Sequence, residues 1–361
     1  MIISSMNVSN FRNYQKGEIH FSEGVNILYG ENAQGKTNLL EAAYLSGTTK
    51  SHKGCRDREM IRFGEEEAHI RTIVDKKDAS FRIDLHLKKH KSKGIAINQI
   101  PIKKAYDLFG VLNIIFFSPE DLNIIKNGPS ERRRFLDSEI CQLDKIYLSG
   151  LMKYNKALAQ RNRLLKEIPF KSGLKDTLCA WNETLISYGK QVIERRRRFL
   201  KELNLIISEI HRDLSGQLEE LKLEYAPDVL EEEFDKELIL SEERDLHQGT
   251  TSRGPHRDDV VLKINDIDIR HFGSQGQQRT AALSLKLAEI ELVKSKIMEP
   301  PVLLLDDVLS ELDHHRQDFL LKRIGSIQTI LTCTGLDEFV RNNVRIDRLF
   351  RIDHGQIKME K

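Results

Sequence analysis

The 361-residue sequence contains no apolar run that approaches the roughly 18 residues of a membrane-spanning helix. Its first residues, MIISSMNVSNFRNY, lack the basic flank and apolar block of a signal peptide. The four cysteines are scattered and form no C-x-x-C pair, which argues against a zinc site and against a disulfide framework. These absences predict a soluble, cytoplasmic protein that has reduced, mostly buried cysteines and no membrane partner.

The chain also has little net charge, only +2 at pH 7, so its overall electrostatics do not indicate a nucleic-acid-binding protein. A nucleic-acid partner would have to be held by local basic patches. What the chain does have is 39% apolar residues, enough for a sizeable core, and 31% charged residues, which indicate a heavily solvated surface. Its length suggests about two domains.

Apolar periodicity divides the chain. From residue 68 to about residue 103 the apolar residues alternate with polar ones, as in Phe81, Ile83, Leu85 and Leu87, which predicts a half-buried antiparallel sheet. After residue 136 the apolar steps become three, four and seven, which predicts helices. The second of these helices is expected over residues 177–212, a length of roughly 50 Å. PFKSG at residues 169–173 separates it from the first, and each stripe is expected to pack within the hairpin.

We therefore expect an α/β protein with a helical lobe inserted into it. The head would comprise residues 1–120 and 250–361 and would include an antiparallel β-subdomain at about residues 60–105. Residues 121–249 would form the helical lobe. Within this lobe, the acidic clusters EEEFD and SEERD at residues 231–235 and 241–245 predict a solvated return path.

GENAQGKT at residues 30–37 matches the phosphate-loop pattern G-x-x-x-x-G-K-[ST], between an apolar strand and a predicted helix from Lys36 to about Gly47. Glycines let the loop curl so that its N–H groups converge on phosphate oxygens. The lysine would reach the β and γ phosphates, and the threonine would bind Mg²⁺. A chance glycine-rich turn is the alternative. The predicted nucleotide-binding residues are Gly30, Glu31, Asn32, Ala33, Gln34, Gly35, Lys36, Thr37 and Asn38.

PVLLLDD at residues 301–307 is an apolar run that ends in acid, as expected for a buried parallel strand, and TILTCTG at residues 329–335 resembles its neighbour. Asp306 would hold Mg²⁺ at the strand's carboxyl end. Asp307 would orient or deprotonate the attacking water, unless it only caps a following helix. Because 269 positions separate Thr37 from Asp306, the pattern points to an ABC-type ATPase head.

GSQGQQRT at residues 273–280 precedes a strongly helical stretch. Ser274 followed three positions later by Gln277 matches a capping box, which predicts that a helix begins here. Such a cap is compatible both with a purely structural role and with a binding role.

The chain resembles the bacterial RecF family over nearly its whole length. The resemblance rests on NFRNY, GENAQGKTN, FFSPEDLNIIKNGPSERRRFLD (116–137), GPHRDD (254–259), GSQGQQRT and LLLDDVLSELD (303–313). It implies an ABC-type ATPase related to the heads of SMC proteins. It further implies ATP and Mg²⁺ as cofactors, binding to DNA gaps and ss/ds junctions, and RecO and RecR as partners in loading RecA onto gaps coated by single-strand-binding protein.

The resemblance assigns roles to individual residues. The phosphate loop falls on Gly30, Gly35, Lys36 and Thr37, the magnesium acid on Asp306, and the signature motif on Ser274, Gly276 and Gln277. The signature would complete the ATP site of a second copy, giving an ATP-dependent homodimer, and residues 310–313 match the loop by which paired heads touch. SPED (118–121) stands where a glutamine loop is expected, with Glu120 and Asp121 as candidates.

Hydrolysis is expected to be slow and to depend on DNA. Asp307 is one methylene shorter than the usual glutamate, and Thr332, Cys333 and Thr334 stand near the place of the switch histidine. A transporter ATPase subunit, another SMC-like DNA-organising ATPase and a non-enzymatic ATP-gated module are the alternatives. DNA contacts could come from residues 88–93, 132–134, 195–198 or Arg257, although a run of charges is more often a solvated surface. For residues 132–134, which belong to the family pattern, a structural ion-pair role is an equal alternative.

Overall fold

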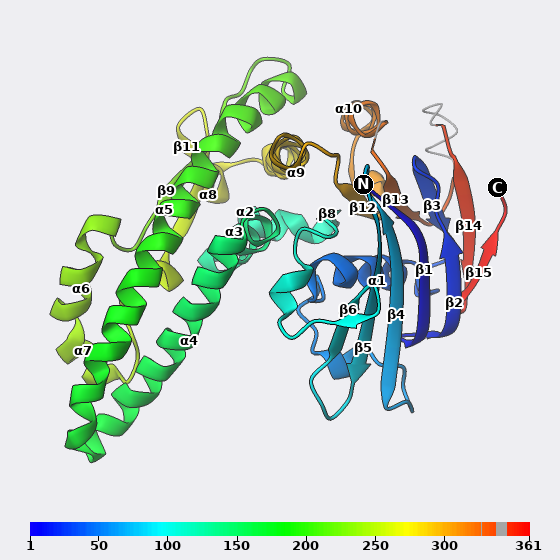
Figure 1. The fold of residues 1–361 in the computed structure, drawn as a ribbon. Helices are drawn as coiled ribbons and strands as arrows, with labels where there is room; N and C mark the ends of the chain where they lie inside the picture. The colour runs from blue at the N-terminus through cyan, green and yellow to red at the C-terminus, as the bar shows by residue number, and fades with distance from the viewer. Residues whose placement is uncertain (326, 337–344) are drawn as a thin grey trace. The chain divides into compact units, whose positions relative to one another are not determined.

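The computed structural model describes residues 1–325, 327–336 and 345–361 (Figure 1). By their internal contacts the residues form two units, Met1–Asp121 with Glu289–Lys361, and Leu122–Ala288. The expected return to the head at residue 250 therefore differs from the observed division. Residues 250–288 belong to the second unit because β10 (Asp259–Ile264) pairs along its whole length with β9 (Leu221–Ala226).

The first unit contains a six-stranded sheet in the order β15-β14-β3-β13-β12-β8. Its parallel part confirms that the PVLLLDD run is a buried strand beside TILTCTG, because β12 pairs in parallel with β13 and with β8. A C-terminal antiparallel hairpin closes the other side. The strands are β3 (Val25–Tyr29), β8 (Ile114–Phe117), β12 (Val302–Asp306), β13 (Thr329–Cys333), β14 (Arg348–Asp353) and β15 (Gln356–Met359).

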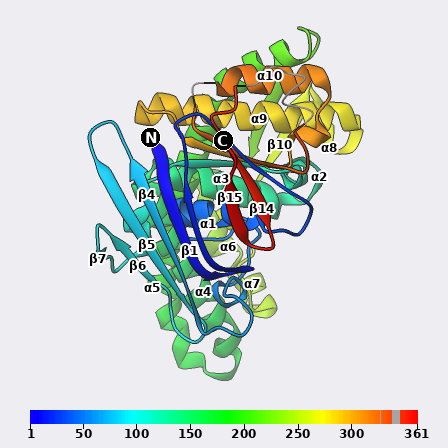
Figure 2. The ribbon, with the colours of Figure 1, turned by 90° about the vertical axis from the view of Figure 1, so that its right-hand side faces the viewer.

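A second, antiparallel sheet has the order β2-β1-β4-β5-β6-β7, and its long strands run side by side in Figure 2. The predicted alternation is confirmed in β5, where Ile83, Leu85 and Leu87 are buried between more exposed polar residues. The strands are β1 (Ile2–Phe11), β2 (Tyr14–His20), β4 (Glu67–Asp75), β5 (Ser80–Lys88), β6 (Gly94–Ile97) and β7 (Ile100–Pro101).

Helix α1 (Lys36–Thr48) shares one hydrophobic core with both sheets of this unit. Its buried residues occupy every side of the helix, as expected for a helix enclosed in a core. Helix α10 (His314–Ile324) follows β12 and buries one apolar side. The phosphate loop therefore connects β3 to a helix that is packed against the core on several sides.

The second unit is mainly helical. Its hairpin of α4 (Lys145–Glu167) and α5 (Lys175–Leu214) confirms the two predicted helices and the break between them. The predicted stripe on α5 is buried at Leu178, Leu185, Val192, Phe199, Leu203 and Ile210. The other elements are α2 (Leu122–Lys126), α3 (Pro129–Leu143), α6 (Phe234–Leu240), α7 (Glu242–Gln248), α8 (Ile269–Phe272), β9, β10 and β11 (Ile267–Asp268). Helix α9 (Gln275–Ile297) begins in this unit and ends in the first.

The expectation that the acidic clusters mark a solvated return path holds for Glu232, Glu233 and Glu243, which are exposed, but not for the whole segment. Phe234 is fully buried in a cluster with Tyr154 and Leu185 of the helical hairpin. Asp245 is also fully buried, and its Oδ2 lies 2.7 Å from Nη1 of the buried Arg161. Phe234 and the Asp245–Arg161 ion pair thus anchor the segment to the helical hairpin, and Glu231 and Asp235 form further ion pairs with Arg197 and Lys190 of α5.

Among the described residues, no helix combines the length and the apolar character needed to cross a bilayer. The four cysteines are free thiols, of which Cys141 and Cys333 are buried and Cys179 is exposed.

Candidate nucleotide-binding site

The phosphate loop connects β3 to α1 through unusual backbone conformations. Gly30 and Gly35 have φ values of 150° and 115°, which favour glycine. A Cβ atom at Gly30 would lie 2.4 Å from the carbonyl oxygen of Ile352, and one at Gly35 would lie 2.5 Å from Nδ2 of Asn13. Both glycines of the motif are therefore required by the backbone and by its close neighbours.

Lys36 begins α1 and folds back over the loop. Its Nζ donates to the carbonyl oxygens of Gly30, at 2.6 Å, and of Glu31, at 2.8 Å. Burial lowers the pKa of Lys36, and the negative charges of Asp307 and Asp306 oppose this shift. The ammonium group is thus poorly hydrated, and its hydrogen bonds to described residues go to neutral carbonyls, so anionic phosphate oxygens would be strong competing partners.

The start of α1 has no side-chain cap. Gly35 occupies the N-cap position, and no side-chain hydrogen bond is made there among the described residues. Unpaired N–H groups at a helix N-terminus, together with the helix dipole, favour an anion. The loop and helix therefore supply the donors that the phosphate-loop motif predicts.

Asp306, at the end of β12, accepts hydrogen bonds from side chains of two other elements. Thr37 of α1 and Thr332 of β13 both donate their hydroxyl groups to Oδ1 of Asp306, each at 2.8 Å. The backbone N–H of Asp307 donates to the Thr332 hydroxyl at 3.0 Å. Thr332 therefore orients the acidic end of β12. Sequence reasoning noticed this threonine only as a residue near the place of a switch histidine.

The pair formed by Thr37 and Asp306 fits Mg²⁺ in its chemistry. Both offer oxygen ligands, which Mg²⁺ prefers, and adjacent ligands of an octahedral ion with bonds of about 2.1 Å lie roughly 3 Å apart. The observed separation of 2.8 Å between their oxygens is close to this value. A magnesium ion here would be held by these two side chains.

Asp307 follows the strand with a φ of 54°. Burial raises the pKa of its carboxyl group, and the positive charge of Lys36 opposes the shift. The following 3₁₀ turn, Leu309–Glu311, has Val308 as its N-cap and no side-chain cap, although the Ser310 hydroxyl donates to the carbonyl oxygen of Asp307 at 2.8 Å. Asp307 is a carboxylate beside the phosphate loop with a raised pKa, as a general base requires.

Asn13, between β1 and β2, and Tyr14, the first residue of β2, form hydrogen bonds with the phosphate loop. The sequence had assigned neither residue a role of its own. Asn13 donates through Nδ2 to the carbonyl oxygen of Gln34 at 2.8 Å, and Tyr14 donates its hydroxyl to that of Gly35 at 3.0 Å. Asn38 in turn donates to Oδ1 of Asn13 at 2.9 Å. The NFRNY stretch, noted only as part of the family pattern, was the available signal.

The signature segment lies in the second unit and confirms the predicted capping box. The backbone N–H of Gln277 donates to the Ser274 hydroxyl at 3.2 Å, and the N–H of Ser274 donates to Oε1 of Gln277 at 2.9 Å. Gln277 also donates to Glu219 at 2.8 Å, which ties the cap to the connection after α5. Ser274 and Gly276 remain exposed. The start of α9 is therefore rigid, and its exposed surface is polar.

Two further family-matched segments lie on the first unit. Asp121 accepts a hydrogen bond from the backbone N–H of Ser118 at 2.7 Å, so this candidate for the glutamine-loop role stabilises its own turn. Ser310 and Asp313 of the SELD segment are exposed, and Asp313 caps α10 by accepting from the N–H of Arg316.

Most arginines of the second unit's basic clusters form structural ion pairs. Arg132 is only 3% exposed and contacts both oxygens of Asp259, at 2.6 and 2.9 Å. Arg196 is 2% exposed and pairs with Asp258 at 3.0 Å. Arg257, in contrast, is exposed and forms no ion pair with a described residue. The buried arginines are thus unsuited to contact DNA.

The comparisons agree with this geometry. The family model described as "RecF/RecN/SMC N terminal domain" matches residues 2–358. The chain is 61% identical to the DNA replication and repair protein RecF of Agathobacter rectalis, with 99% of each chain covered. It is 56% identical to the RecF protein of Lachnospira eligens, with 100% of each covered.

Solved structures are similar as well. A structure of the recombination mediator protein RecF with ATP, in the RecFOR pathway, has a TM-score of 0.93 at 37% identity, covering 99% of this chain and 97% of that one. An Smc head domain from Pyrococcus furiosus has a TM-score of 0.57 at 18% identity, covering 99% and 95%. The latter match shows a shared fold, that of the ABC-type ATPase head.

Proposed function

Because the chain belongs to the RecF family of DNA replication and repair proteins, we propose that it is an ATP-dependent DNA-binding protein of recombinational repair. It binds single-stranded gaps and ss/ds junctions, dimerises when it binds ATP and hydrolyses ATP slowly in a DNA-dependent manner. It works with RecO and RecR to load RecA onto gaps coated by single-strand-binding protein. Because it would act on chromosomal DNA, the protein would be located in the cytoplasm.

The observation that carries the proposal is the convergence of Lys36, Thr37 and Asp306 beside a phosphate loop with the required backbone. In this proposal residues 30–38 hold the triphosphate of ATP, and Lys36 exchanges its carbonyl partners for the β and γ phosphates. Thr37 and Asp306 hold Mg²⁺, which would neutralise phosphate charge. RecF structures with ATP support the identity of the nucleotide.

Hydrolysis is assigned to Asp307, which would take a proton from the attacking water. Its raised pKa improves it as a base, and the positive charge of the neighbouring Lys36 opposes the shift. Thr332 holds the acidic strand end in place but has no group that could act as a histidine does. The shorter acid and the absence of a histidine at this place support a slow turnover, suited to a switch.

The signature residues Ser274, Gly276 and Gln277 would act in trans, on the ATP of a second copy. The observed cap makes the start of α9 rigid, and its exposure leaves it accessible to another molecule. Residues 310–313, also exposed, would touch the partner head. ATP would then lie between two copies, which couples nucleotide binding to dimerisation.

DNA would be held by exposed cations only. Buried and paired arginines such as Arg132 and Arg196 are set aside, which leaves Arg257 as the exposed candidate in the GPHRDD motif. A dimer would combine such patches from two copies, so a net charge of only +2 presents no obstacle. Contacts to phosphates predict affinity that falls steeply with salt.

The decisive experiment is light scattering with ATP, without ATP, and with ATP plus gapped DNA. We expect a dimer only when ATP is present, and tighter dimerisation when gapped DNA is added. Ser274→Arg should bind ATP and remain a monomer. A variant that dimerises normally would contradict the composite site, and an ATP turnover as fast as that of transport ATPases would contradict the switch.

A further inference from the structure

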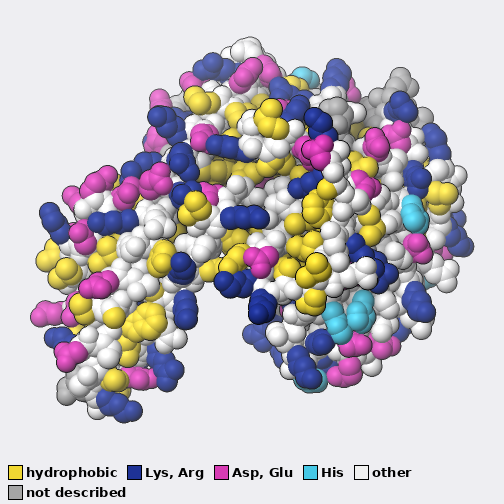
Figure 3. Space-filling view, in the orientation of Figure 1, with side chains coloured by type: hydrophobic (Ala, Val, Ile, Leu, Met, Phe, Trp, Pro, Cys, Tyr) yellow, Lys and Arg dark blue, Asp and Glu magenta, His cyan; other side chains and the backbone are white. Residues whose placement is uncertain are grey.

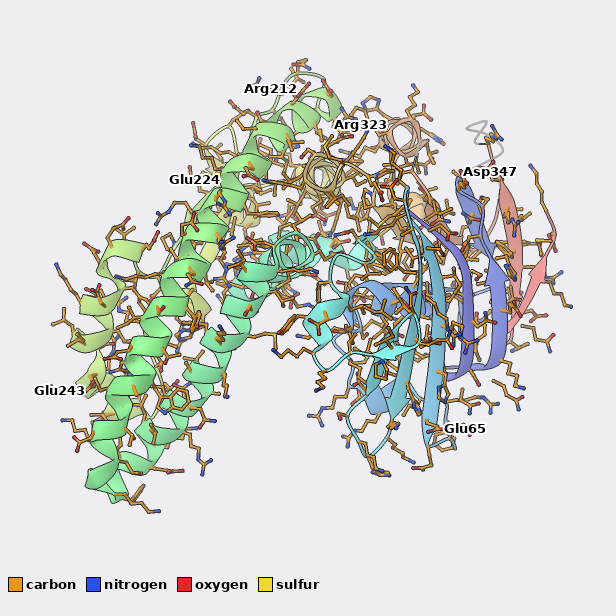
Figure 4. The ribbon with its side chains drawn as sticks, viewed as in Figure 1. Glu65, Arg212, Glu224, Glu243, Arg323 and Asp347 are labelled. Atoms are coloured by element: carbon orange, nitrogen blue, oxygen red, sulfur yellow. The ribbon has the colours of Figure 1, made fainter. Side chains whose placement is uncertain are left out.

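A group of polar side chains unrelated to the nucleotide site lies on the antiparallel sheet of the first unit. His69 of β4 and His86 of β5 are directly opposite each other in the strand register. Their rings are stacked, with centroids 4.0 Å apart and planes inclined by 27°. Figure 3 shows histidine side chains grouped beside acidic ones, and Glu65, labelled in Figure 4, marks the approach to this end of β4.

Glu67 brings one carboxylate close to the Nε2 atoms of both imidazoles. Its Oε2 lies 2.7 Å from Nε2 of His86, and its Oε1 lies 3.6 Å from Nε2 of His69. One ligand atom from each residue can be chosen so that all three lie within 4.8 Å of one another. Two nitrogen donors and one oxygen donor therefore lie close together at the surface.

We propose that Glu67, His69 and His86 form a binding site for a divalent transition-metal ion, with Zn²⁺ as the preferred ion and water completing its shell. Two histidines and one carboxylate are a known ligand set for Zn²⁺ with an open position. Imidazole ligands favour Zn²⁺ and its transition-metal neighbours over Mg²⁺ and Ca²⁺.

The distances suit the ion. Zn²⁺ in tetrahedral geometry, with bonds of about 2.0–2.2 Å, needs ligand atoms roughly 3.4 Å apart. Glu67 would move slightly away from His86 and slightly toward His69 to reach this value. The three side chains are between 31% and 52% exposed, so they have room for this adjustment and the ion can enter from solvent.

The backbone holds the ligands in place. Both strands are interior to the six-stranded sheet, and the residues next to the ligands, Ala68, Ile70, Leu85 and Leu87, are buried on its opposite face. The strand register therefore fixes the separation of the two histidines before an ion arrives. Preorganisation of this kind reduces the ordering cost of binding.

Two neighbouring arginines share one carboxylate, which offsets part of their positive charge. The guanidinium of Arg71 is paired with Asp84 at 2.9 Å, and that of Arg82 is paired with the same carboxylate at 2.7 Å. In front of the histidines lies a hollow of about 670 Å³, lined by residues of β1, β2, β4 and β5 and open to solvent. It can accept the water molecules, or a small anionic ligand, that would complete the coordination of the ion.

The competing explanation is a structural pair, in which His86 simply hydrogen-bonds Glu67 and stacks on His69. The two explanations separate in a metal titration. Untagged protein, freed of metal by a chelator, is titrated with Zn²⁺ by calorimetry in excess Mg²⁺, and with Co²⁺ while its visible spectrum is recorded. We expect one ion per chain and the absorption bands of a Co²⁺ ion with nitrogen and oxygen ligands.

His69→Ala and His86→Ala should each weaken Zn²⁺ binding at least about tenfold, since even loss of an outer-shell partner costs that much. Glu67→Gln should weaken it as well. The matched control is His90→Ala, because His90 is also exposed and lies 3.5 Å from Glu66, outside the ligand group. Thermal melts of the variants without metal check that each is folded.

Three results would overturn the proposal. One is the absence of stoichiometric Zn²⁺ binding by the folded wild type. Another is binding that the His69 and His86 variants leave unchanged. The third is Zn²⁺ binding that Asp306→Asn weakens, which would assign the ion to the nucleotide site. None of these results would alter the proposed ATP cycle, because the metal site and the phosphate loop share no residue.

Discussion

Two helix N-termini, those of α1 and α9, carry the two halves of the proposed ATP site, and they are built in opposite ways. Helix α1 begins at Lys36 without a side-chain cap, after a glycine in the left-handed region. Helix α9 begins with a reciprocal cap between Ser274 and Gln277. The first leaves its donors for a ligand, whereas the second satisfies part of its own backbone.

This difference predicts that the two helix starts act in different steps, the start of α1 in ATP binding and the start of α9 in dimerisation. The start of α1 is enclosed by the core of the first unit and supported by Asn13 and Tyr14, so it can bind phosphate within one chain. The start of α9 is exposed and rigid but lies in the other unit, where a second molecule could reach it. Changes near α1 should therefore affect binding and chemistry, and changes at α9 should affect dimerisation.

The largest effect is expected from Asp307→Asn, next to the start of α1. Loss of a general base lowers the turnover of ATP by about 10²–10⁴-fold, while ATP binding and ATP-dependent dimerisation remain. In the wild type, turnover should fall as the pH falls through the raised pKa of Asp307, because protonation removes the base, and it should do so at a higher pH than for an ordinary aspartate.

Steady-state hydrolysis from acid to neutral pH and light scattering with ATP measure both parts of this prediction. An Asp307→Asn protein with unchanged turnover would assign the base to another residue. A DNA-binding cycle that is unaffected by loss of turnover would favour a binding module in which ATP serves only to close the dimer.

Lys36→Ala should weaken ATP binding by roughly 100-fold, because a charge-assisted contact to phosphate is worth about 1.5–3 kcal/mol. Calorimetry or a fluorescent ATP analogue measures the change. Lys50→Ala is the matched control, since Lys50 is exposed just beyond the opposite end of α1. If both variants bind ATP as the wild type does, the loop does not hold the nucleotide through Lys36.

Ser274→Asp tests the α9 end, because aspartate caps a helix about as well as serine. Thermal stability and ATP binding by the monomer should stay unchanged. Dimerisation should weaken about tenfold or more, because the new carboxylate would face the γ phosphate of the partner's ATP. Ser274→Asn, which caps without charge, is the control and should dimerise more strongly than Ser274→Asp. Equal dimerisation of the two variants would leave Ser274 a purely structural cap.

Local patterns made the site largely predictable from sequence. The phosphate loop, the strand that ends at Asp306 and the cap at Ser274 each depend on residues within a few positions of one another. The residues that identify each of these features are therefore close together in the sequence. Thr332 was missed because its role depends on β13 lying beside β12, and that pairing brings it to Asp306.

Features that depend on distant partners were less predictable. Residues 250–288 belong to the helical unit because β10 pairs with β9, more than thirty positions earlier. The burial of Arg196 depends on Asp258, and that of Asp245 on Arg161, 62 and 84 positions away. Charge runs in the sequence indicated solvated surfaces, but ion pairs between distant segments bury some of their members.

The smallest effect is expected from Tyr14→Phe, which tests the support beneath the start of α1. The change removes the hydroxyl that donates to the carbonyl oxygen of Gly35, in a buried position. Losing this bond should cost about 1 kcal/mol of stability and lower ATP affinity about fivefold, because the loop becomes less ordered. Tyr29→Phe is the control, since the Tyr29 hydroxyl donates to Glu360 at 2.6 Å in an exposed position. Chemical denaturation and ATP titration compare the two. If both variants lose the same affinity, the contact from Tyr14 gives the phosphate loop no specific support, and the loop would have to be held by Asn13 and its own backbone.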